Sequence, residues 1–433
     1  MPRPFRECVA FYIGGGWGKE VEDDQHTAIA RVIRGTDIPD ARLNIADSFP
    51  VRFHKPSNAR SRLLRKGDIV FEVSGGSRDQ PVGRSVFVTD SLAKAPTIPA
   101  SFCKLIRPQS RICDPKFIYY TLTSAYISRK LVQWQTQSTG IINYSFEAFL
   151  DEYEIDLPPL VTQRKIAAVL SAYDDLIENN TRRVRVLEEM ARALYREWFV
   201  EYRFPGHEQA EFVEDEQGRR PKAWEWVPVA YAVELDPRTK VDKEAVNPFV
   251  PMGSLSENSM VIDPVEQRAG NSGAKFKNGD TLFARITPCL ENGKTGLVNF
   301  LPDDSATAFG STEYIVMRSR LVCPEYVYLL ARLPEFRSHA EKSMSGASGR
   351  QRVRSESLSN YFIALPDKAT LASFQALVKP MFAAVFNLSS RNANLRRTRD
   401  LLLPKLVSGE LDVSQLEIAG VEEGQGVNEE AVA

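Results

Sequence analysis

Two segments of this chain, residues 166–198 and 374–406, carry apolar side chains in alternating steps of four and three residues. This period of 3.5 residues, sustained for this length, is typical of helices that pair as a coiled coil. We therefore expect long helices at 158–200 and 366–409, each with its seam against the other. The first seam is Ile166, Leu170, Tyr173, Ile177, Asn180, Val184, Leu187, Ala191, Leu194 and Trp198, and the second is Phe374, Val378, Met381, Val385, Leu388, Asn392, Leu395, Arg399, Leu402 and Leu406.

Each seam holds one asparagine, and an antiparallel arrangement would place Asn180 opposite Asn392. An asparagine pair at a seam can fix register at a cost in stability. The alternative is that each asparagine is solvated at a frayed point. Pro380 and Pro404 lie within the second seam, so we expect a kink or interruption there and an end near Pro404.

The rest of the chain also contains an internal repeat, with an offset in sequence similar to the one that separates the two seams. Residues 66–84 resemble 278–296, and residues 138–159 resemble 345–367, in their pattern of strand, polar loop and Leu-Pro ending. The sequence therefore predicts an α+β fold with a pseudo-two-fold internal repeat, in which two similar globular α/β domains are separated by two long helices that pair as an antiparallel coiled coil. The expected parts are a globular domain (1–157), a helix (158–200), a second globular domain (201–365), a second helix (366–409) and an acidic tail (410–433) that is disordered in large part.

Composition narrows the class of protein further. The net charge is −1, but the tail holds seven acidic residues and no basic one, so residues 1–409 carry +6. There is no apolar run of 18 residues, which argues against a transmembrane helix. The five cysteines and four histidines are scattered without metal-ligand or disulfide spacing, so we expect a cytoplasmic protein without a metal site.

Three stretches resemble the specificity subunit of type I restriction–modification enzymes. They are residues 157–200, residues 279–294 with the sequence GDTLFARITPCLENGK, and residues 395–411 with the sequence LRRTRDLLLPKLVSGEL. Residues 221–229 are similar to the usual opening of a recognition domain, but Ala223 stands where glycine is usual. The first domain lacks this opening altogether.

The resemblance implies a non-catalytic DNA-binding subunit. Each globular domain would be a target-recognition domain for one half of a bipartite double-stranded DNA target, and the paired helices would set the spacing and dock partners. Those partners would be DNA adenine methyltransferase subunits, two in number, and restriction/translocase subunits, with no membrane. S-adenosylmethionine, ATP and Mg²⁺ would belong to the partners, and this subunit would hold no cofactor.

Polar, glycine-rich loops at equivalent places in the two domains are the candidate DNA contacts. Arg, Asn, Gln and Glu can read base edges, while Lys, Ser and Thr suit phosphates. A solvated loop is the alternative for any single residue. The first domain offers Arg65, Lys66, Ser74, Ser77, Arg78, Arg84, Gln137, Ser138, Thr139, Asn143 and Tyr144, and the second offers Arg285, Thr287, Glu291, Asn292, Lys294, Ser345, Ser348, Arg350, Gln351 and Arg352.

Two other classes of function remain open on the sequence alone. One is a bivalent coiled-coil scaffold that binds proteins without DNA readout, and the other is an enzyme with an unrecognised site. Asn247-Pro248-Phe249 has one proline where a methyltransferase loop needs two. Gly293-Lys294-Thr295 lacks the earlier glycine of a phosphate-binding loop, and Gly14–Gly18 lacks a helix pattern after it.

Overall fold

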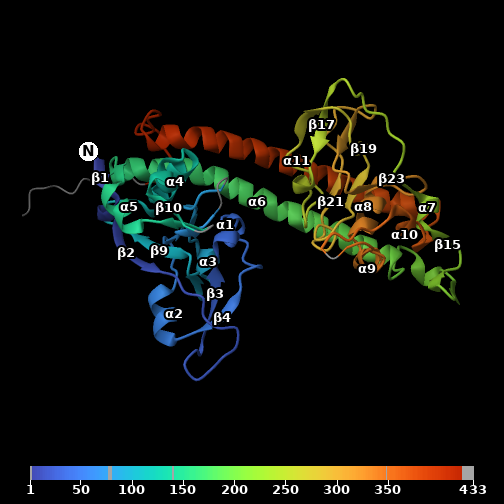
Figure 1. The fold of residues 1–433 in the computed structure, drawn as a ribbon, viewed down its shortest axis with the longest axis horizontal. Coiled ribbons are helices and arrows are strands. Elements are labelled where there is room, and N and C mark those ends of the chain that lie inside the picture. The colour runs from blue at the N-terminus through green and yellow to red at the C-terminus, as the bar shows by residue number, and fades with distance from the viewer. Residues whose placement is uncertain (1, 77–79, 139–140, 348, 422–433) are drawn as a thin grey trace, which may run out of the picture. The chain divides into compact units, whose positions relative to one another are not determined.

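The computed structural model of the chain describes residues 2–76, 80–138, 141–347 and 349–421 (Figure 1). The chain divides into two compact units. Unit 1 comprises residues 1–179 and 392–433, and unit 2 comprises residues 180–391. The two long helices, α6 (Leu160–Phe199) and α11 (Lys368–Val407), each contribute residues to both units.

Helices α6 and α11 occupy the two predicted helical segments and pack together within each unit. In unit 1, Ile166 and Leu170 of α6 share a core with Leu403 and Leu406 of α11. In unit 2, the aromatic ring of Trp198 lies 5.7 Å from that of Phe374. Early residues of one helix thus meet late residues of the other, which is antiparallel packing. None of the twenty seam side chains is exposed.

The expected interruption of the second helix is wrong, but its expected end near Pro404 is confirmed. α11 is continuous through Pro380 and Pro404 and ends at Val407. Both prolines are exposed, as is Ala376, whose carbonyl loses its helical partner to Pro380. Water can therefore satisfy that carbonyl, and the helix continues.

Helix α11 is also the one helix among the described residues that is long and apolar enough to cross a membrane, judged by length and composition alone. Its side chains Phe374, Val378 and Val385 are fully buried in the core of unit 2.

Unit 1 combines short helices with small sheets. Its helices are α1 (Ile38–Ala41), α2 (Pro56–Arg62), α3 (Asp90–Ala93), α4 (Pro115–Ile127) and α5 (Phe146–Glu152), with 3-10 turns at Phe5–Cys8, Gly35–Asp37 and Lys130–Trp134. Its sheets, in spatial order, are β2 (Val9–Gly14), β9 (Cys103–Pro108), β5 (Ile69–Glu72) and β7 (Ser85–Phe87); β4 (Val51–His54), β3 (Ala28–Ile33) and β8 (Thr97–Pro99); β10 (Gln135–Ser138), β11 (Ile141–Tyr144) and β6 (Ser74–Gly75); and β1 (Pro2–Pro4) with β12 (Glu154–Asp156).

Unit 2 uses the same kinds of element. Its helices are α7 (Val229–Ala232), α8 (Pro324–Arg332), α9 (Pro334–Lys342) and α10 (Ser355–Ser359), with 3-10 turns at His207–Gln209 and Met252–Ser254. Its sheets, in spatial order, are β16 (Val233–Leu235), β23 (Tyr314–Ser319), β20 (Thr281–Ala284) and β21 (Thr295–Leu297); β18 (Glu266–Ala269), β17 (Val246–Val250), β22 (Thr307–Gly310) and β19 (Ala274–Lys277); β15 (Glu225–Pro228) with β24 (Phe362–Leu365); and β13 (Phe212–Asp215) with β14 (Gly218–Pro221).

The repeated Gly-Asp dipeptide begins the same structure in each unit. Gly67 and Gly279 adopt φ of +88° and +85°, a conformation that favours glycine. Each following aspartate is buried and receives a forked arginine. Arg107 binds Asp68 with Nε–Oδ1 and Nη2–Oδ2 distances of 2.7 and 2.8 Å. Arg318 binds Asp280 with 2.7 Å at both contacts. These ion pairs fix the start of the central strands β5 and β20, whose ends carry the candidate loops.

In each unit the last strand of the globular part pairs with a strand near its start; in unit 2 the β13–β14 hairpin precedes that strand. β1 lies antiparallel to β12, with Pro4 opposite Glu154, and β15 lies antiparallel to β24, with Glu225 opposite Leu365.

Candidate nucleic-acid interface

In unit 1 the two predicted loops meet through a short sheet. β6 pairs with β11, with Ser74 opposite Asn143, and the Ser74 hydroxyl donates to Asn143 Oδ1 at 2.9 Å. β10 extends this sheet and presents the exposed Gln137. Residues 69 positions apart in sequence thus form one polar surface.

In unit 2 the corresponding loops also meet. Arg352 forms isolated β-bridges with both Ile286 and Ser345. The backbone N–H and the hydroxyl of Thr287 both donate to the carbonyl oxygen of Gln351, each at 3.1 Å. Loops 285–294 and 345–352 are therefore a single surface, on which Arg350 is exposed.

The guanidinium of Arg352 is oriented by Glu313, a residue that the sequence did not single out. Arg352 donates to both carboxylate oxygens, with Nη2–Oε1 at 2.7 Å and Nε–Oε2 at 2.9 Å. The hydrogen bond from Arg352 holds the pKa of Glu313 below its usual value. The fork leaves the Arg352 side chain exposed but in a fixed direction, which suits recognition of a planar acceptor. No local signal marks Glu313, because it lies 39 residues away in sequence.

Two predicted contacts have structural roles instead. Arg84 is largely buried and donates to both oxygens of Glu72, at 2.8 and 2.6 Å. Tyr144 is 8% exposed, and its ring centroid lies 5.4 Å from those of Phe71 and Phe149. Arg84 is thus better explained as half of an internal ion pair, and Tyr144 as a core side chain.

The other predicted contacts differ in their hydrogen-bond partners and in their exposure. Lys66 is exposed and pairs with Asp90 at 2.6 Å, Arg285 donates to the carbonyl of Val353 at 3.1 Å, and Lys294 donates to that of Met252 at 3.4 Å. Exposed positions are Arg65, Glu291, Asn292 and Ser345 in addition to those above. Ser77, Arg78, Thr139 and Ser348 lie outside the described residues, as does the side chain of Ser138.

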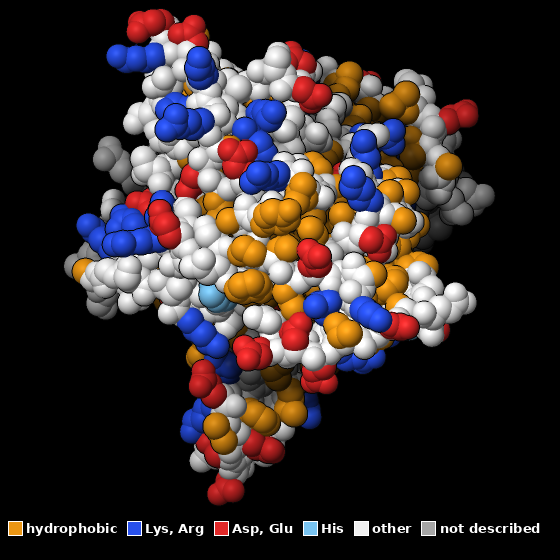
Figure 2. Space-filling view, turned by 90° about the vertical axis from the view of Figure 1, so that its right-hand side faces the viewer, with side chains coloured by type: hydrophobic (Ala, Val, Ile, Leu, Met, Phe, Trp, Pro, Cys, Tyr) orange, Lys and Arg blue, Asp and Glu red, His pale blue; other side chains and the backbone are white. Residues whose placement is uncertain are grey.

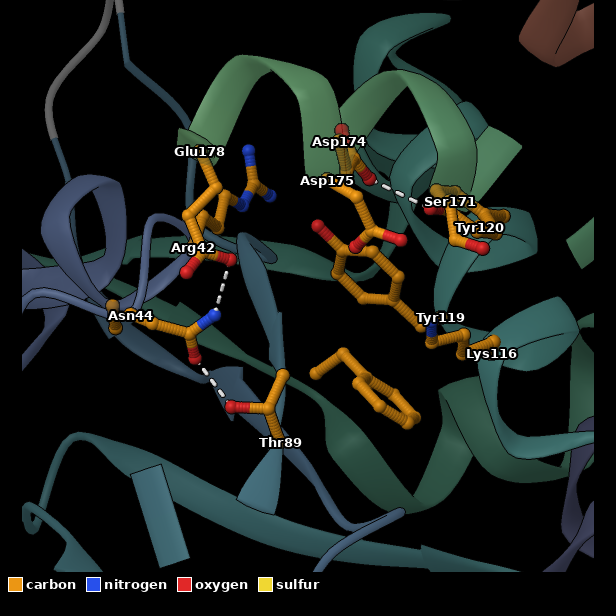
Figure 3. A pocket seen from close by; sticks show the side chains of 12 residues that line it. Arg42, Asn44, Thr89, Lys116, Tyr119, Tyr120, Ser171, Asp174, Asp175 and Glu178 are labelled. Carbon is orange, nitrogen blue, oxygen red and sulfur yellow. Dashed lines mark hydrogen bonds between the residues drawn. The ribbon is translucent and has the colours of Figure 1, made fainter. Parts of the chain in front are cut away.

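A separate polar pocket of about 60 Å³ lies within unit 1, between the globular part and α6 (Figure 3). Asp174 accepts from the Tyr120 hydroxyl at 2.6 Å and from Arg399 Nη1 at 2.5 Å. Glu178 accepts from Asn44 Nδ2 at 2.6 Å. A solvated helix face would leave these carboxylates free, so the pocket instead marks where the helices are tied to the domain.

The view in Figure 2 faces unit 2 on the side of α7 and β15, where apolar side chains gather. Three exposed apolar residues lie on α7 or on segments bonded to α7 and β15. They are Tyr231 of α7 (54% exposed), Leu321, whose N–H donates to Ala232 of α7 (47%), and Phe362 of β24, the strand paired with β15 (45%).

Within the part of the chain that the structure describes, no group of three or more His, Cys, Asp or Glu side chains could hold a metal ion.

Comparisons with known proteins give consistent results. Residues 59–189 match the family described as the type I restriction modification DNA specificity domain. The chain is 24% identical over 420 residues to the type I restriction enzyme HindI specificity subunit of Haemophilus influenzae, covering 82% of this chain and 89% of that protein. It is 25% identical over 279 residues to the MjaIX specificity subunit of Methanocaldococcus jannaschii, covering 62% of each.

Among solved structures, the chain is similar to the type I restriction–modification S subunit from M. genitalium. The TM-score is 0.53 at 12% identity, covering 94% of this chain and 95% of that one. This likeness concerns the fold.

Proposed function

We infer that this chain, which belongs to the specificity subunits of type I restriction–modification enzymes, recognises double-stranded DNA in two halves, one read by each globular domain. The observation that carries this inference is the repeated loop junction, Ser74 with Asn143 in unit 1 and Thr287 with Gln351 in unit 2. Both junctions begin at the end of a central strand that starts with a forked Asp–Arg pair.

The chemistry of these junctions suits base edges. Gln137 and Asn143 can pair with adenine in the major groove, and Arg350 and Arg352 can pair with guanine. Glu291 can accept from cytosine N4. These amide and guanidinium groups favour DNA readout over a protein scaffold, because they can pair bidentately with base edges.

The helices have a different role in this proposal. α6 and α11 form an antiparallel coiled coil that relates the domains by a pseudo-two-fold repeat and fixes the gap between half-sites. Each helix is 40 residues long, which is about 60 Å at 1.5 Å per residue. Methyltransferase subunits, two of them, dock on this core, and restriction subunits join through them.

Catalysis belongs to those partners in this proposal. S-adenosylmethionine, ATP and Mg²⁺ are bound by the methyltransferase and restriction subunits in the cytoplasm, and this chain binds none of them. The near-zero net charge fits this division, because a subunit that reads bases can leave most phosphate contacts to its partners.

The test is co-expression of the chain with its methyltransferase in a host without adenine methylation, followed by sequencing of methylated adenines. We expect methylation at one bipartite motif only when both proteins are present. Methylation without a motif, or by the methyltransferase alone, would contradict the proposal.

Arg350→Ala sharpens the test at one junction. Loss of a base contact should weaken binding to the motif by about 1–3 kcal/mol and leave binding to a scrambled duplex unchanged. Arg219→Ala is the matched control, since Arg219 is also an exposed arginine of unit 2 but packs over the Phe212 ring at 4.2 Å. Equal losses on both duplexes would make Arg350 a phosphate contact.

A further inference from the structure

Two arginines of unit 2, Arg332 at the end of α8 and Arg337 in α9, donate to backbone carbonyl oxygens. Among the described residues no carboxylate lies within 4.0 Å of either guanidinium. An arginine that is partly buried without an acidic partner is uncommon, because its charge must then be satisfied by neutral acceptors.

All the donors of Arg332 are in use. Nε donates to the Tyr328 hydroxyl at 2.9 Å. Nη1 donates to the carbonyls of Glu257 at 2.6 Å and Gly293 at 2.9 Å. Nη2 donates to the carbonyls of Ser259 at 2.6 Å and Thr295 at 3.0 Å, with a longer contact to that of Ser256 at 3.3 Å. One guanidinium therefore joins segment 256–259 to residues 293–295.

Arg337 holds the same loop at a second place. Its Nη2 donates to the carbonyl of Leu290, and its Nη1 lies 3.4 Å from the Thr295 hydroxyl. Its guanidinium also lies over the Phe283 ring, 5.6 Å from the centroid. The carbonyls of residues 290, 293 and 295 are thus all bound from the inner side by the two arginines.

The loop between these anchor points is a tight turn. The N–H groups of Leu290, Asn292 and Lys294 donate to the carbonyls of residues 286, 288 and 289. Gly293 has φ of +89°, and a Cβ added there would lie 3.1 Å from the Glu257 carbonyl oxygen, 3.8 Å from Arg332 and 3.9 Å from Arg337. The backbone is therefore pressed against the arginines, while the side chains of Glu291 and Asn292 are exposed on the other side.

Segment 256–260 is also bound by a buried carboxylate of α6, that of Glu188. Glu188 accepts from the Met260 N–H at 2.7 Å and from the Ser259 hydroxyl at 2.9 Å. Segment 256–260 is thus fixed by Glu188 on one side and by Arg332 on the other, and the candidate DNA loop rests on that segment.

The contacts of Arg332 and Arg337 given above all lie within unit 2. A loss of the two arginines should therefore affect only the half-site that unit 2 reads.

We propose that Arg332 and Arg337 are positioning residues that hold loop 286–295 in the one shape in which it reads its half of the DNA target. This rests on the proposed function. Lysine cannot replace Arg332, because a single ammonium group cannot span segment 256–259 and residues 293–295. Nor can it replace Arg337, because it cannot reach both the Leu290 carbonyl and the Thr295 hydroxyl.

The experiment uses the full chain with its co-expressed methyltransferase and a pool of duplexes with random sequence. Bound duplexes are selected and sequenced for the wild type and for Arg332→Lys, Arg337→Lys and Arg220→Lys. Arg220→Lys is the matched control, since Arg220 is another partly buried arginine of unit 2 that donates to backbone carbonyls, those of Pro221 and Trp224, rather than to the loop. Hydrogen exchange of amides 286–295 is measured in parallel on all four proteins.

We expect Arg332→Lys and Arg337→Lys to lose about tenfold or more of the preference at one half-site, the size of one good base contact. The other half-site should remain, and exchange in 286–295 should rise. Arg220→Lys should keep both half-sites. Retention of both half-sites and of loop protection in Arg332→Lys would overturn the inference, as would equal loss in Arg220→Lys. A wild-type pool with no bipartite motif would instead overturn the proposed function, and loop exchange would still decide whether the arginines hold the loop.

Discussion

Phe374 of α11 provides the most direct test of the helix packing. Its side chain has no exposed surface, and its ring centroid lies 4.7 Å from Phe199, 5.7 Å from Trp198 and 6.3 Å from Tyr195. An aromatic side chain buries about 150–250 Å². At about 25 cal/mol per Å² this corresponds to roughly 4–6 kcal/mol, and alanine keeps only the Cβ part of that gain.

We therefore expect Phe374→Ala to lower the free energy of unfolding by about 3–5 kcal/mol. The assay is urea unfolding followed by tryptophan fluorescence, which reports chiefly on unit 2 because three of the five tryptophans lie there. Leu377→Ala on the same helix is the control, since Leu377 is 46% exposed and should cost about 1 kcal/mol or less. Equal midpoints for the two variants would refute the packing described for α6 and α11.

Three further predictions concern single side chains. Burial raises the pKa of Glu188, so its contribution to stability is present below its ordinary pKa and is lost as pH rises through the raised value. Glu188→Gln should therefore gain stability relative to wild type as pH rises above the ordinary pKa of a glutamate, measured in urea titrations, and a constant difference would contradict this. Asn392 Nδ2 donates to the Ile177 carbonyl at 3.2 Å, so replacing Asn392 and Asn180 by leucine should yield more than one register in cysteine crosslinking of α6 to α11; a single unchanged species would remove the register role. The Tyr144 hydroxyl is buried with no hydrogen-bond partner among the described residues, so Tyr144→Phe should leave DNA selection unchanged and cost no stability, whereas a lost half-site would restore Tyr144 as a contact.

The long helices could be predicted because their signal is local. The spacing of Ile166, Leu170 and Ile177 along one face is set by the helix itself, whatever it packs against. The effect of Pro380 was harder to predict, since it depends on whether the freed carbonyl meets water. That is a property of the assembled unit.

The loops that form each candidate surface could be predicted from the sequence, but the roles of individual residues could not. The repeated polar loops indicated the two junctions, but the roles of Arg84 and Arg352 depend on carboxylates supplied by the fold. Glu72 forms an internal ion pair with Arg84, and Glu313 orients the guanidinium of Arg352 at the surface. The sequence did not indicate that Arg332 contacts the loop, because an arginine at the end of a helix is usually solvated.

In each globular part the last strand pairs with a strand near its start, and this pairing has a consequence for inheritance. Pro4 opposite Glu154 and Glu225 opposite Leu365 mean that the segment between the paired strands enters and leaves its sheet at one place. The part of the gene that encodes this segment can therefore be exchanged by recombination as a cassette whose two ends meet the same framework. Under the proposed function, such an exchange changes one half of the DNA target at a time and leaves the two long helices as they were.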